Sequence, residues 1–542
     1  MKTVLDIFRD LIEANRKGFC KGIYSICSAH PDVLDACFKR AKKDKSLIVI
    51  ESTWNQVDQY SGYTGMKFIF ILIFLLSSTT SFSNNMKKSK PNFVFILVDD
   101  LGWADVNCYF SKSFYDTPNI NKLATNGVRF TQAYSASTVC SPSRAALLTG
   151  KQPNNLNITD WIPGDSPKDR QMIGPNISHK LELKEVTMAE KLQLEGYKTC
   201  FIGKWHLGDE GFFPEDQGFD INIGGHQNGS PPGGYYSPYK NPKLEDGPEG
   251  EYLTDRLTSE SIDFIEKNKN NPFFLYLAFY TVHTPIQASK RYIEKYKTKG
   301  ETIKYDKILY KGEGKAWTKM LQCNPSYASM VAAMDYNVGR IIETLKNLGI
   351  DENTWVFFTS DNGGLSTHTF KDPPTSNEPL RAGKGWCYEG GIRVPLIIKG
   401  PKIAAPGRSV DQPVIGMDLY TTILSLAKVE HKKYDGENLL PILFNFKILN
   451  RNLLFWHYPH YHGSGWTPGS ALRKDNWKLI MFYEDSHTEL YDLQNDPGES
   501  NDLSSQFPKL TVELKNQLYE MLDKSNAKFP RPNSTIDNSI CH

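Results

Sequence analysis

Side chains with hard oxygen atoms follow two apolar runs of the sequence. Asp99 and Asp100 come directly after the run Asn92–Val98, and Asp361 and Asn362 follow the run 354–360. Carboxylate and amide oxygens are ligands that Ca²⁺ and Mg²⁺ prefer. One Asp pair after a strand often only caps a loop, but two such pairs favour a metal site. The pattern predicts a bound divalent cation, with Ca²⁺ expected and Mg²⁺ as the alternative.

A cysteine stands where a loop turns into a predicted helix. Residues 140–150 read CSPSRAALLTG, and Pro142 with the run to Leu148 favours a helix that begins near Cys140. The amino end of a helix attracts anions because its backbone N–H groups and its dipole point there. The segment therefore indicates either a nucleophile beside an anion site or a buried structural cysteine.

Cationic and imidazole side chains follow two further runs. Lys204 and His206 lie in GYKTCFIGKWHLG (196–208), His283 follows the run 273–280, and Lys384 lies in RAGKGWCYEGGIRVP (381–395). A single lysine is usually solvated and a single histidine is often structural. Together with a cation, however, these groups can stabilise negative charge on a bound anion.

These motifs resemble those of a known family, the type I sulfatases of the alkaline phosphatase superfamily. CSPSRAALLTG matches the family signature C-x-P-S-R-x-x-x-L-T-G at every fixed position, and residues 196–208 resemble the second signature. The resemblance covers about residues 91–525 and implies a sulfuric ester hydrolase. It also implies that a formylglycine-generating maturase oxidises Cys140, that one hydroxyl of the hydrated aldehyde attacks sulfur, and that the second hydroxyl then expels sulfate.

The resemblance implies a role for each matching residue. Ca²⁺ would be bound by formylglycine at Cys140 together with Asp99, Asp100, Asp361 and Asn362. Arg144 would hold the formylglycine hydroxyl, with His206 nearby. The sulfate would be gripped by Lys204, His283 and Lys384, and either His283 or Lys384 would protonate the leaving alkoxide.

Aromatic and polar residues near the carboxyl end suit a sugar. The stretch WHYPHYH (456–462) and a later arginine supply the predicted substrate-binding residues His457, His460, His462 and Arg473. A metal-binding histidine tract or simple packing would explain the same pattern. The stretch resembles that of bacterial sulfatases that desulfate galactose or N-acetylgalactosamine units, which favours a sulfated carbohydrate or glycosaminoglycan substrate.

Buried strands must position these groups. Near-continuous apolar runs at 92–98, 197–202, 273–280, 354–359 and 394–398 predict strands covered on both faces, with helical patterns between them. Ligand sites of open α/β sheets collect at the carboxyl ends of such strands. The prediction is a large mixed-sheet α/β sandwich, alkaline phosphatase-like, over residues 91–450, with a smaller C-terminal α/β domain over 451–542.

The first part of the chain has a different character. Met66–Lys67, nine apolar residues and SSTTSFS make 66–83 typical of an export signal, since a membrane span needs about 20 apolar residues. We expect Met66 to be the biological start and the protein to be exported to the periplasm or the medium, with no stable membrane span. An uncleaved anchor and a genuine fusion protein are the alternatives.

Residues 20–65 resemble the opening strands and helix of the non-catalytic subunit of class II tagatose-bisphosphate aldolase, a TIM-barrel protein. The fragment 1–65 is too short to close an eight-stranded barrel, so we expect no aldolase role.

Composition narrows the remaining function classes. The 542 residues are 39% hydrophobic and 23% charged with a net charge of +2, which lacks the basic excess that nucleic-acid binding needs. The nine cysteines form no CxxC pair. Besides a sulfatase, two hypotheses remain: a phosphate or phosphonate ester hydrolase of the same superfamily, and a non-catalytic sulfated-glycan binding protein whose cysteine is never matured.

Overall fold

The computed structural model describes residues 90–165, 167, 169–303, 308–370, 372–430 and 434–535, and the backbone of two short strands before them. The chain forms two compact units, Met1–Lys87 and Lys88–His542. In the first unit, β1 (Tyr24–Ile26) and β2 (Ile48–Ile50) pair in parallel. The predicted export signal at 66–83 lies outside the described residues. Within those residues, none of the helices combines the length and apolar character that crossing a membrane requires.

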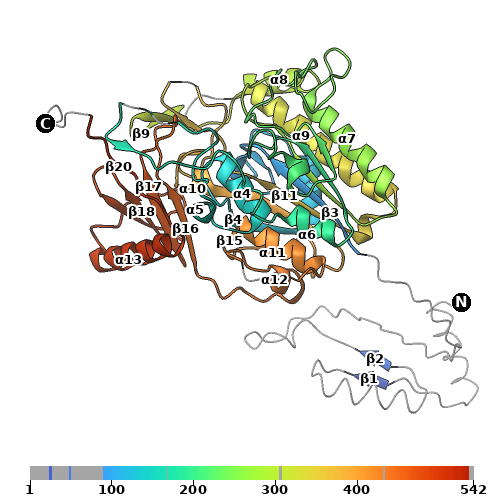
Figure 1. Ribbon diagram of the computed structural model, residues 1–542. Helices are drawn as coiled ribbons and strands as arrows, with labels where there is room; N and C mark the ends of the chain where they lie inside the picture. Colours follow the sequence, from blue (N-terminus) through green and yellow to red (C-terminus); the bar gives the residue numbers. More distant parts are fainter. Residues whose placement is uncertain are drawn as a thin grey trace, which may run out of the picture. The chain divides into compact units, whose positions relative to one another are not determined.

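A nine-stranded mixed sheet forms the centre of the second unit (Figure 1). Its middle strands are parallel, whereas β13 runs antiparallel to both of its neighbours. In spatial order the strands are β14 (Ser409–Val410), β4 (Val128–Tyr134), β13 (Arg393–Lys399), β11 (Thr354–Ser360), β3 (Asn92–Val98), β8 (Phe273–Ala278), β6 (Lys198–Gly203) and β7 (Ile221–Ile223), with β15 (Val414–Ile415) also paired to β4. The five predicted strands are confirmed.

Helices cover both faces of this sheet. Phe93, Phe95 and Leu97 of β3 enter one core, and the intervening Val94 and Ile96 enter the other. The first face carries α4 (Cys140–Thr149), α6 (Met188–Leu194), α11 (Met417–Leu426) and α12 (Leu440–Asn445), and the second carries α3 (Pro118–Thr125), α7 (Leu253–Asn268) and α9 (Pro325–Asn347). Further helices in this part of the chain are α5 (Pro153–Leu156), α8 (Ile293–Glu301) and α10 (Glu389–Ile392). The predicted α/β sandwich is therefore confirmed.

Local sequence signals set the beginnings of two helices. Thr187 caps α6 by accepting from the Glu190 backbone N–H at 3.1 Å, and the Glu190 side chain accepts from the Thr187 backbone N–H at 2.7 Å. Pro118 opens α3. The apolar stripe of α9 is buried against the sheet and contributes to the core.

The C-terminal part is a four-stranded antiparallel sheet with one helix. Its strands are β16 (Leu453–Tyr458), β17 (Gly469–Lys474), β18 (Trp477–Phe482) and β19 (Thr488–Asp492), in that order, and its helix is α13 (Pro508–Lys524). Leu514 and Leu518 of α13 pack on one face. The other face shares a core with the main sheet through Trp456 and Tyr134. A smaller C-terminal α/β region is thus present, while its predicted boundary at residue 450 stays a prediction.

Two small sheets were not predicted. The order β12 (Thr367–His368), β10 (Ala316–Lys319), β9 (Tyr310–Glu313) forms one, and β20 (Arg531–Pro532) pairs with β5 (Met172–Ile173) in the other. These strands span two to four residues each and are too short to show an alternating pattern in the sequence.

Candidate active site

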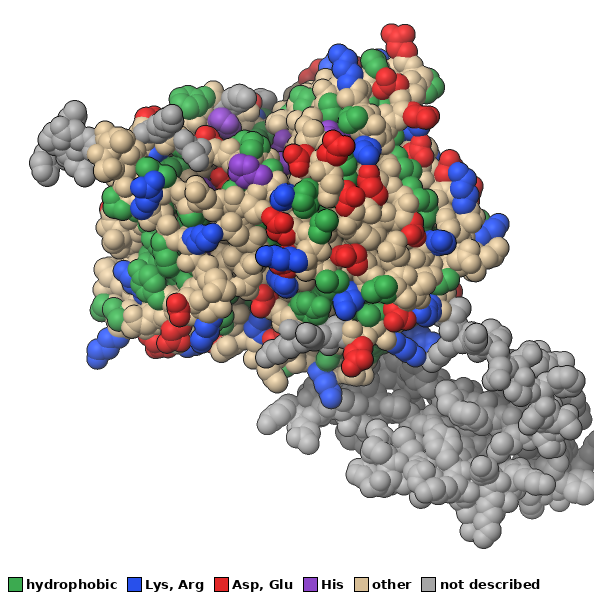
Figure 2. All heavy atoms as spheres, viewed as in Figure 1, with side chains coloured by type: hydrophobic (Ala, Val, Ile, Leu, Met, Phe, Trp, Pro, Cys, Tyr) green, Lys and Arg blue, Asp and Glu red, His purple; other side chains and the backbone are tan. Residues whose placement is uncertain are grey.

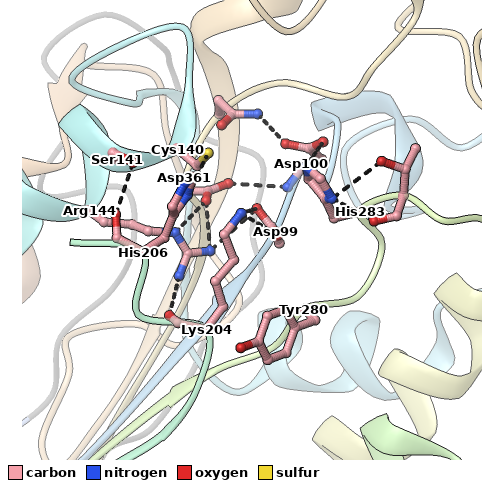
Figure 3. A network of polar contacts seen from close by, with 12 residues as sticks. Asp99, Asp100, Cys140, Ser141, Arg144, Lys204, His206, Tyr280, His283 and Asp361 are labelled. Atoms are coloured by element: carbon pink, nitrogen blue, oxygen red, sulfur yellow. Dashed lines mark hydrogen bonds and ion pairs between the residues drawn. The ribbon is translucent and has the colours of Figure 1, made fainter. Parts of the chain in front are cut away.

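The carboxyl ends of β3 and β11 bring the predicted metal ligands together. The two strands are parallel neighbours in which Val98 pairs with Ser360, so the residues that follow them emerge side by side. Oxygen atoms of Asp99, Asp100 and Asp361 lie within 4.8 Å of one another, and all three residues are buried. Asp100 has a φ of 58° in the left-handed region, which turns the chain sharply at the end of β3. Figure 3 shows the three carboxylates converging.

Asn362 adds an uncommitted oxygen to this group. Its Nδ2 donates to Asp100 Oδ1 at 2.8 Å and to the Gly363 carbonyl at 3.0 Å. Its Oδ1 is buried and has no hydrogen-bond partner among the described residues. An orphaned amide oxygen beside three buried carboxylates is the donor set that a hard divalent cation binds. The residues present therefore fit such an ion.

Cationic side chains surround the carboxylates. Lys204 Nζ lies 2.8 Å from Asp99 Oδ2, Lys384 Nζ lies 2.8 Å from Asp100 Oδ1, and Arg144 Nε donates to Asp361 Oδ2 at 2.8 Å. Burial raises the pKa of Asp99 well above its ordinary value, with Lys204 offsetting part of the effect. Burial alone would also raise the pKa of Asp100, but Lys384, His283 and Lys204 together hold that pKa below its ordinary value.

Cys140 opens helix α4 beside His206. Its Sγ lies 3.4 Å from His206 Nδ1. His206 Nε2 lies 2.6 Å from the Ile162 carbonyl, which can only accept, so Nε2 carries the proton and Nδ1 presents a lone pair to residue 140. Burial, with Lys204 nearby, lowers the pKa of His206 well below its ordinary value. The ring is therefore neutral at neutral pH and oriented as a base toward residue 140.

A cavity of about 630 Å³ opens over these groups. Cys140, His206, His283 and Lys384 all contribute to its lining. His283 Nδ1 donates to the Thr284 carbonyl at 2.8 Å, which leaves its Nε2 unprotonated in the neutral ring, 3.7 Å from Asp100 Oδ2. Burial, with a smaller contribution from Lys384, lowers the pKa of His283 to about 3. The structure thus brings the predicted catalytic and metal-binding residues to one place.

Comparison with known proteins identifies the architecture. A family model for sulfatases matches residues 91–429. The chain belongs to the sulfatase family. A second model, for the C-terminal part of N-sulphoglucosamine sulphohydrolase, matches residues 382–526. Residues 8–87 match a model for the D-tagatose-1,6-bisphosphate aldolase subunit, GatZ/KbaZ-like, in agreement with the resemblance at 20–65.

Individual relatives support the assignment. The chain is 32% identical to a sulfatase of Formosa agariphila over 547 residues, covering 85% of this chain and 94% of that protein. It is 34% identical to the N-acetylgalactosamine-6-sulfatase of Rattus norvegicus over 466 residues, covering 76% of this chain and 80% of that protein. The crystal structure of Ps i-CgsB in complex with k-i-k-neocarrahexaose superposes with a TM-score of 0.65 at 30% identity, covering 81% of this chain and 95% of that chain.

The phosphonate monoester hydrolase of Agrobacterium radiobacter shares the fold alone, with a TM-score of 0.56 at 19% identity, covering 80% of this sulfatase and 96% of that chain. Sulfatases typically use a metal ion and a formylglycine, and the buried group of Asp99, Asp100 and Asp361 can hold a metal ion.

Of the four predicted substrate-binding residues, the structure brings only His462 to the cavity. His457 is buried and contacts Ser470 Oγ at 2.6 Å and the Lys528 carbonyl at 3.0 Å. His460 contacts Thr159 Oγ1 at 2.9 Å. Arg473 donates to the Tyr134 and Gln132 side chains. The structure places these three residues outside the cavity and in contact with protein groups, and their role in substrate binding stays a prediction.

Loop residues that the sequence did not signal complete the cavity of this sulfatase. They come from four separate loops and are Trp161, His179, Asp209, Gln227, Asn228 and Ser230. The Trp161 loop is held from behind by Asp160, whose Oδ1 accepts from the Tyr458 hydroxyl at 2.7 Å and from the Trp161 backbone N–H at 2.8 Å. Burial raises the pKa of Asp160 to about 7.

The raised pKa of Asp160 predicts a pH dependence of stability. The folded state binds this proton more tightly than the unfolded chain, whose Asp has a pKa of about 3.9. The stabilisation is therefore fully present below about pH 4 and is lost as the pH rises through about 7. The quantity to compare is the unfolding free energy of the wild type minus that of Asp160→Asn. We expect this difference to fall by about 2 to 4 kcal/mol between pH 4 and pH 8.

Denaturant unfolding of both proteins at several pH values measures this difference. Burial lowers the pKa of the neighbouring His460 to about 3, and its contribution has the opposite sign. Because His460 is present in both proteins, its effect cancels in the comparison. A difference that does not change with pH would contradict the prediction.

Proposed function

We propose that this sulfatase releases sulfate from a sulfated carbohydrate, using formylglycine formed from Cys140 and a Ca²⁺ ion, with Mg²⁺ as the alternative ion. One observation carries the proposal: Cys140, His206, His283 and Lys384 line a single cavity whose floor adjoins the buried carboxylates. A nucleophile position, a base, a proton donor and an oxyanion site are thereby assembled in one pocket.

Each group has a defined task in this proposal. When bound, Ca²⁺ would be held by Asp99, Asp100, Asp361 and Asn362 and would act as a Lewis acid on the sulfuryl oxygens. The hydrated formylglycine would supply the attacking hydroxyl and, through its second hydroxyl, the route by which sulfate leaves. His206 Nδ1 faces residue 140 and is placed to accept a hydroxyl proton.

Lys384 is the better placed of the two predicted proton donors. The neutral His283 ring donates its proton to the Thr284 carbonyl, whereas the Lys384 ammonium lines the cavity and has a third proton beyond its contacts with the two Asp100 oxygens. We therefore assign protonation of the leaving alkoxide to Lys384, and stabilisation of the sulfate oxygens to Lys204 and Lys384. In the net reaction, water and the sulfate ester give the alcohol and hydrogen sulfate.

Charge counting agrees with these tasks. The three carboxylates of Asp99, Asp100 and Asp361 are balanced by the Lys204, Lys384 and Arg144 side chains that contact them. A divalent cation and a product sulfate dianion would then add no net charge to a buried site. Burying unbalanced charge is costly, so this balance favours the binding of an anionic ester together with a metal ion.

The relatives narrow the proposed substrate. An N-acetylgalactosamine-6-sulfatase and a protein solved with a neocarrahexaose are among them, which supports a galactose or N-acetylgalactosamine sulfate ester. We further propose that a maturase converts Cys140 before folding is complete, because the folded side chain is only 3% exposed. With Met66 as the start, the enzyme would be exported and would act on polysaccharide outside the cytoplasm.

Matched aryl esters test the proposed reaction. We expect protein from a host that contains a maturase to hydrolyse 4-nitrophenyl sulfate with a kcat/KM on the order of 10²-fold above that for 4-nitrophenyl phosphate. Sulfate release from galactose and N-acetylgalactosamine monosulfates is measured in parallel. A preference for the phosphate or for a phosphonate ester would replace the sulfatase proposal by the ester hydrolase alternative.

A further inference from the structure

An exposed tryptophan stands on the small sheet β12-β10-β9. The Trp317 side chain in β10 is 59% exposed, and Phe370, two residues after β12, is 90% exposed. Large aromatic side chains are usually buried to a greater extent, and an exposed pair on one small element marks a binding surface more often than isolated apolar residues do.

The sheet register determines which side of β10 carries the indole. Trp317 pairs with Gly312 of β9 and with His368 of β12. Residues that pair directly across antiparallel strands project from the same face. The next residue, Thr318, contacts Thr367 through their hydroxyls at 2.8 Å on the buried face. The indole therefore lies on the solvent face, between an imidazole on one side and a glycine with open space beside it on the other.

This surface is continuous with the wall of the Cys140 cavity. The Thr369 backbone N–H and hydroxyl both donate to the Gly463 carbonyl, at 3.3 Å and 3.0 Å. Gly463 follows His462, which lines the cavity. On the other side of that loop, a Cβ at Gly465 would lie 2.6 Å from the Ala316 side chain, so β10 packs directly against it. Figure 2 shows histidine side chains gathered on the face between β9 and α4, with hydrophobic side chains beside them.

We propose that Trp317, His368 and Phe370 form an outer subsite that stacks a neighbouring sugar of an oligosaccharide whose sulfated residue occupies the Cys140 cavity. The inference rests on the proposed function. A flat indole offers an apolar face to the C–H face of a pyranose at little conformational cost. The turn between β9 and β10 also carries the exposed Lys315, whose charge complements a sulfated polymer.

The occupant is a glycan segment, because the surface adjoins the catalytic cavity through one short loop. A protein partner needs about 800 Å² on each side, which calls for a wider apolar area than two aromatic side chains on a three-stranded sheet. The same argument disfavours a second copy of this chain. Substrates with several sugar units should thus bind better than the sulfated monosaccharide alone.

Comparing two substrate lengths tests the subsite. The Trp317→Ala variant is assayed with a sulfated galactan hexasaccharide and with the monosaccharide that bears the same sulfate. We expect kcat/KM to fall about 5- to 20-fold for the hexasaccharide and to stay unchanged for the monosaccharide. Trp317→Phe, which keeps a ring, should retain most of the hexasaccharide activity. Phe446→Ala is the matched control, since that aromatic side chain is 62% exposed and lies at the end of α12.

The outcomes separate this inference from the proposed function. Equal losses on both substrates, or no loss on either, would overturn the outer subsite. A shift in oligomeric state on Trp317→Ala, measured by sedimentation, would assign the surface to a second copy and would also overturn it. If no substrate is hydrolysed at all, the proposed function fails, and calorimetric binding of the hexasaccharide to the protein with and without Trp317→Ala still tests the subsite.

Discussion

The Cys140→Ala variant is expected to lose sulfate release by at least about 10⁴-fold. Residue 140 is the first residue of α4, it lines the cavity, and its side chain is the group that His206 Nδ1 faces. An alanine there leaves the carboxylates and cations in place but offers no atom to attack sulfur. The loss should appear in kcat, because the groups proposed to bind the sulfate remain.

Controls distinguish lost chemistry from lost folding. Cys108→Ala removes a partly buried thiol that packs in the core on the other face of the sheet, and we expect it to retain activity. The unfolding midpoint of Cys140→Ala should stay close to that of the wild type, because only a small side chain at the cavity wall is lost. Unimpaired turnover by Cys140→Ala would remove residue 140 from the reaction.

The chemical state of residue 140 is a linked measurement. Peptide mass spectrometry of the active protein should show, in the tryptic peptide 130–144, an aldehyde in place of the thiol. A thiol in fully active protein would contradict the formylglycine proposal even if Cys140→Ala were inactive. A thiol in inactive protein would indicate that the maturase had not acted.

The sequence predicted which candidate metal ligands lie together, because these residues sit at strand ends. Asp99 follows β3 and Asp361 follows β11. Adjacent parallel strands bring their carboxyl ends together regardless of the conformation of the loops that connect them. Buried parallel strands also appear in the sequence as continuous apolar runs. These runs predicted the α/β sandwich although the order of the strands in the sheet was not known. The antiparallel β13 and its neighbour β4 could not be ordered in this way, since strand direction is not encoded in an apolar run.

The substrate side of the cavity was not predictable for a physical reason. Trp161, His179, Asp209 and Asn228 come from loops separated along the chain, and tertiary packing alone brings them to one wall. The histidine tract at 457–462 did not show which of its members faces the cavity, because the end of β16 separates them. His457, within β16, is buried by its neighbours, and His462, beyond the end of β16, reaches the cavity.

Removing the divalent ion is expected to abolish turnover and to lower stability together. The three buried carboxylates and the orphaned Asn362 oxygen form a site that exists only in the folded chain. An ion that binds only the folded state stabilises it by about 2.7 kcal/mol at a concentration 100 times the Kd. Exhaustive chelation should therefore lower the unfolding midpoint, and adding Ca²⁺ should restore both the midpoint and activity, with Mg²⁺ as the comparison.

Two aspartate variants make this test specific. Asp100→Asn weakens the carboxylate group and should eliminate most of the Ca²⁺-dependent shift in the unfolding midpoint. Asp105→Asn is the matched control, because Asp105 is equally buried but donates nothing to the cluster: it accepts from the Tyr327 hydroxyl at 2.6 Å and from Thr375 at 2.7 Å. We expect Asp105→Asn to be less stable overall, yet its midpoint should still respond to Ca²⁺. Full activity after chelation, or equal Ca²⁺ responses in the two variants, would contradict the prediction. The carboxylates at the ends of β3 and β11 would then only form ion pairs with Lys204, Lys384 and Arg144 and bind no metal ion.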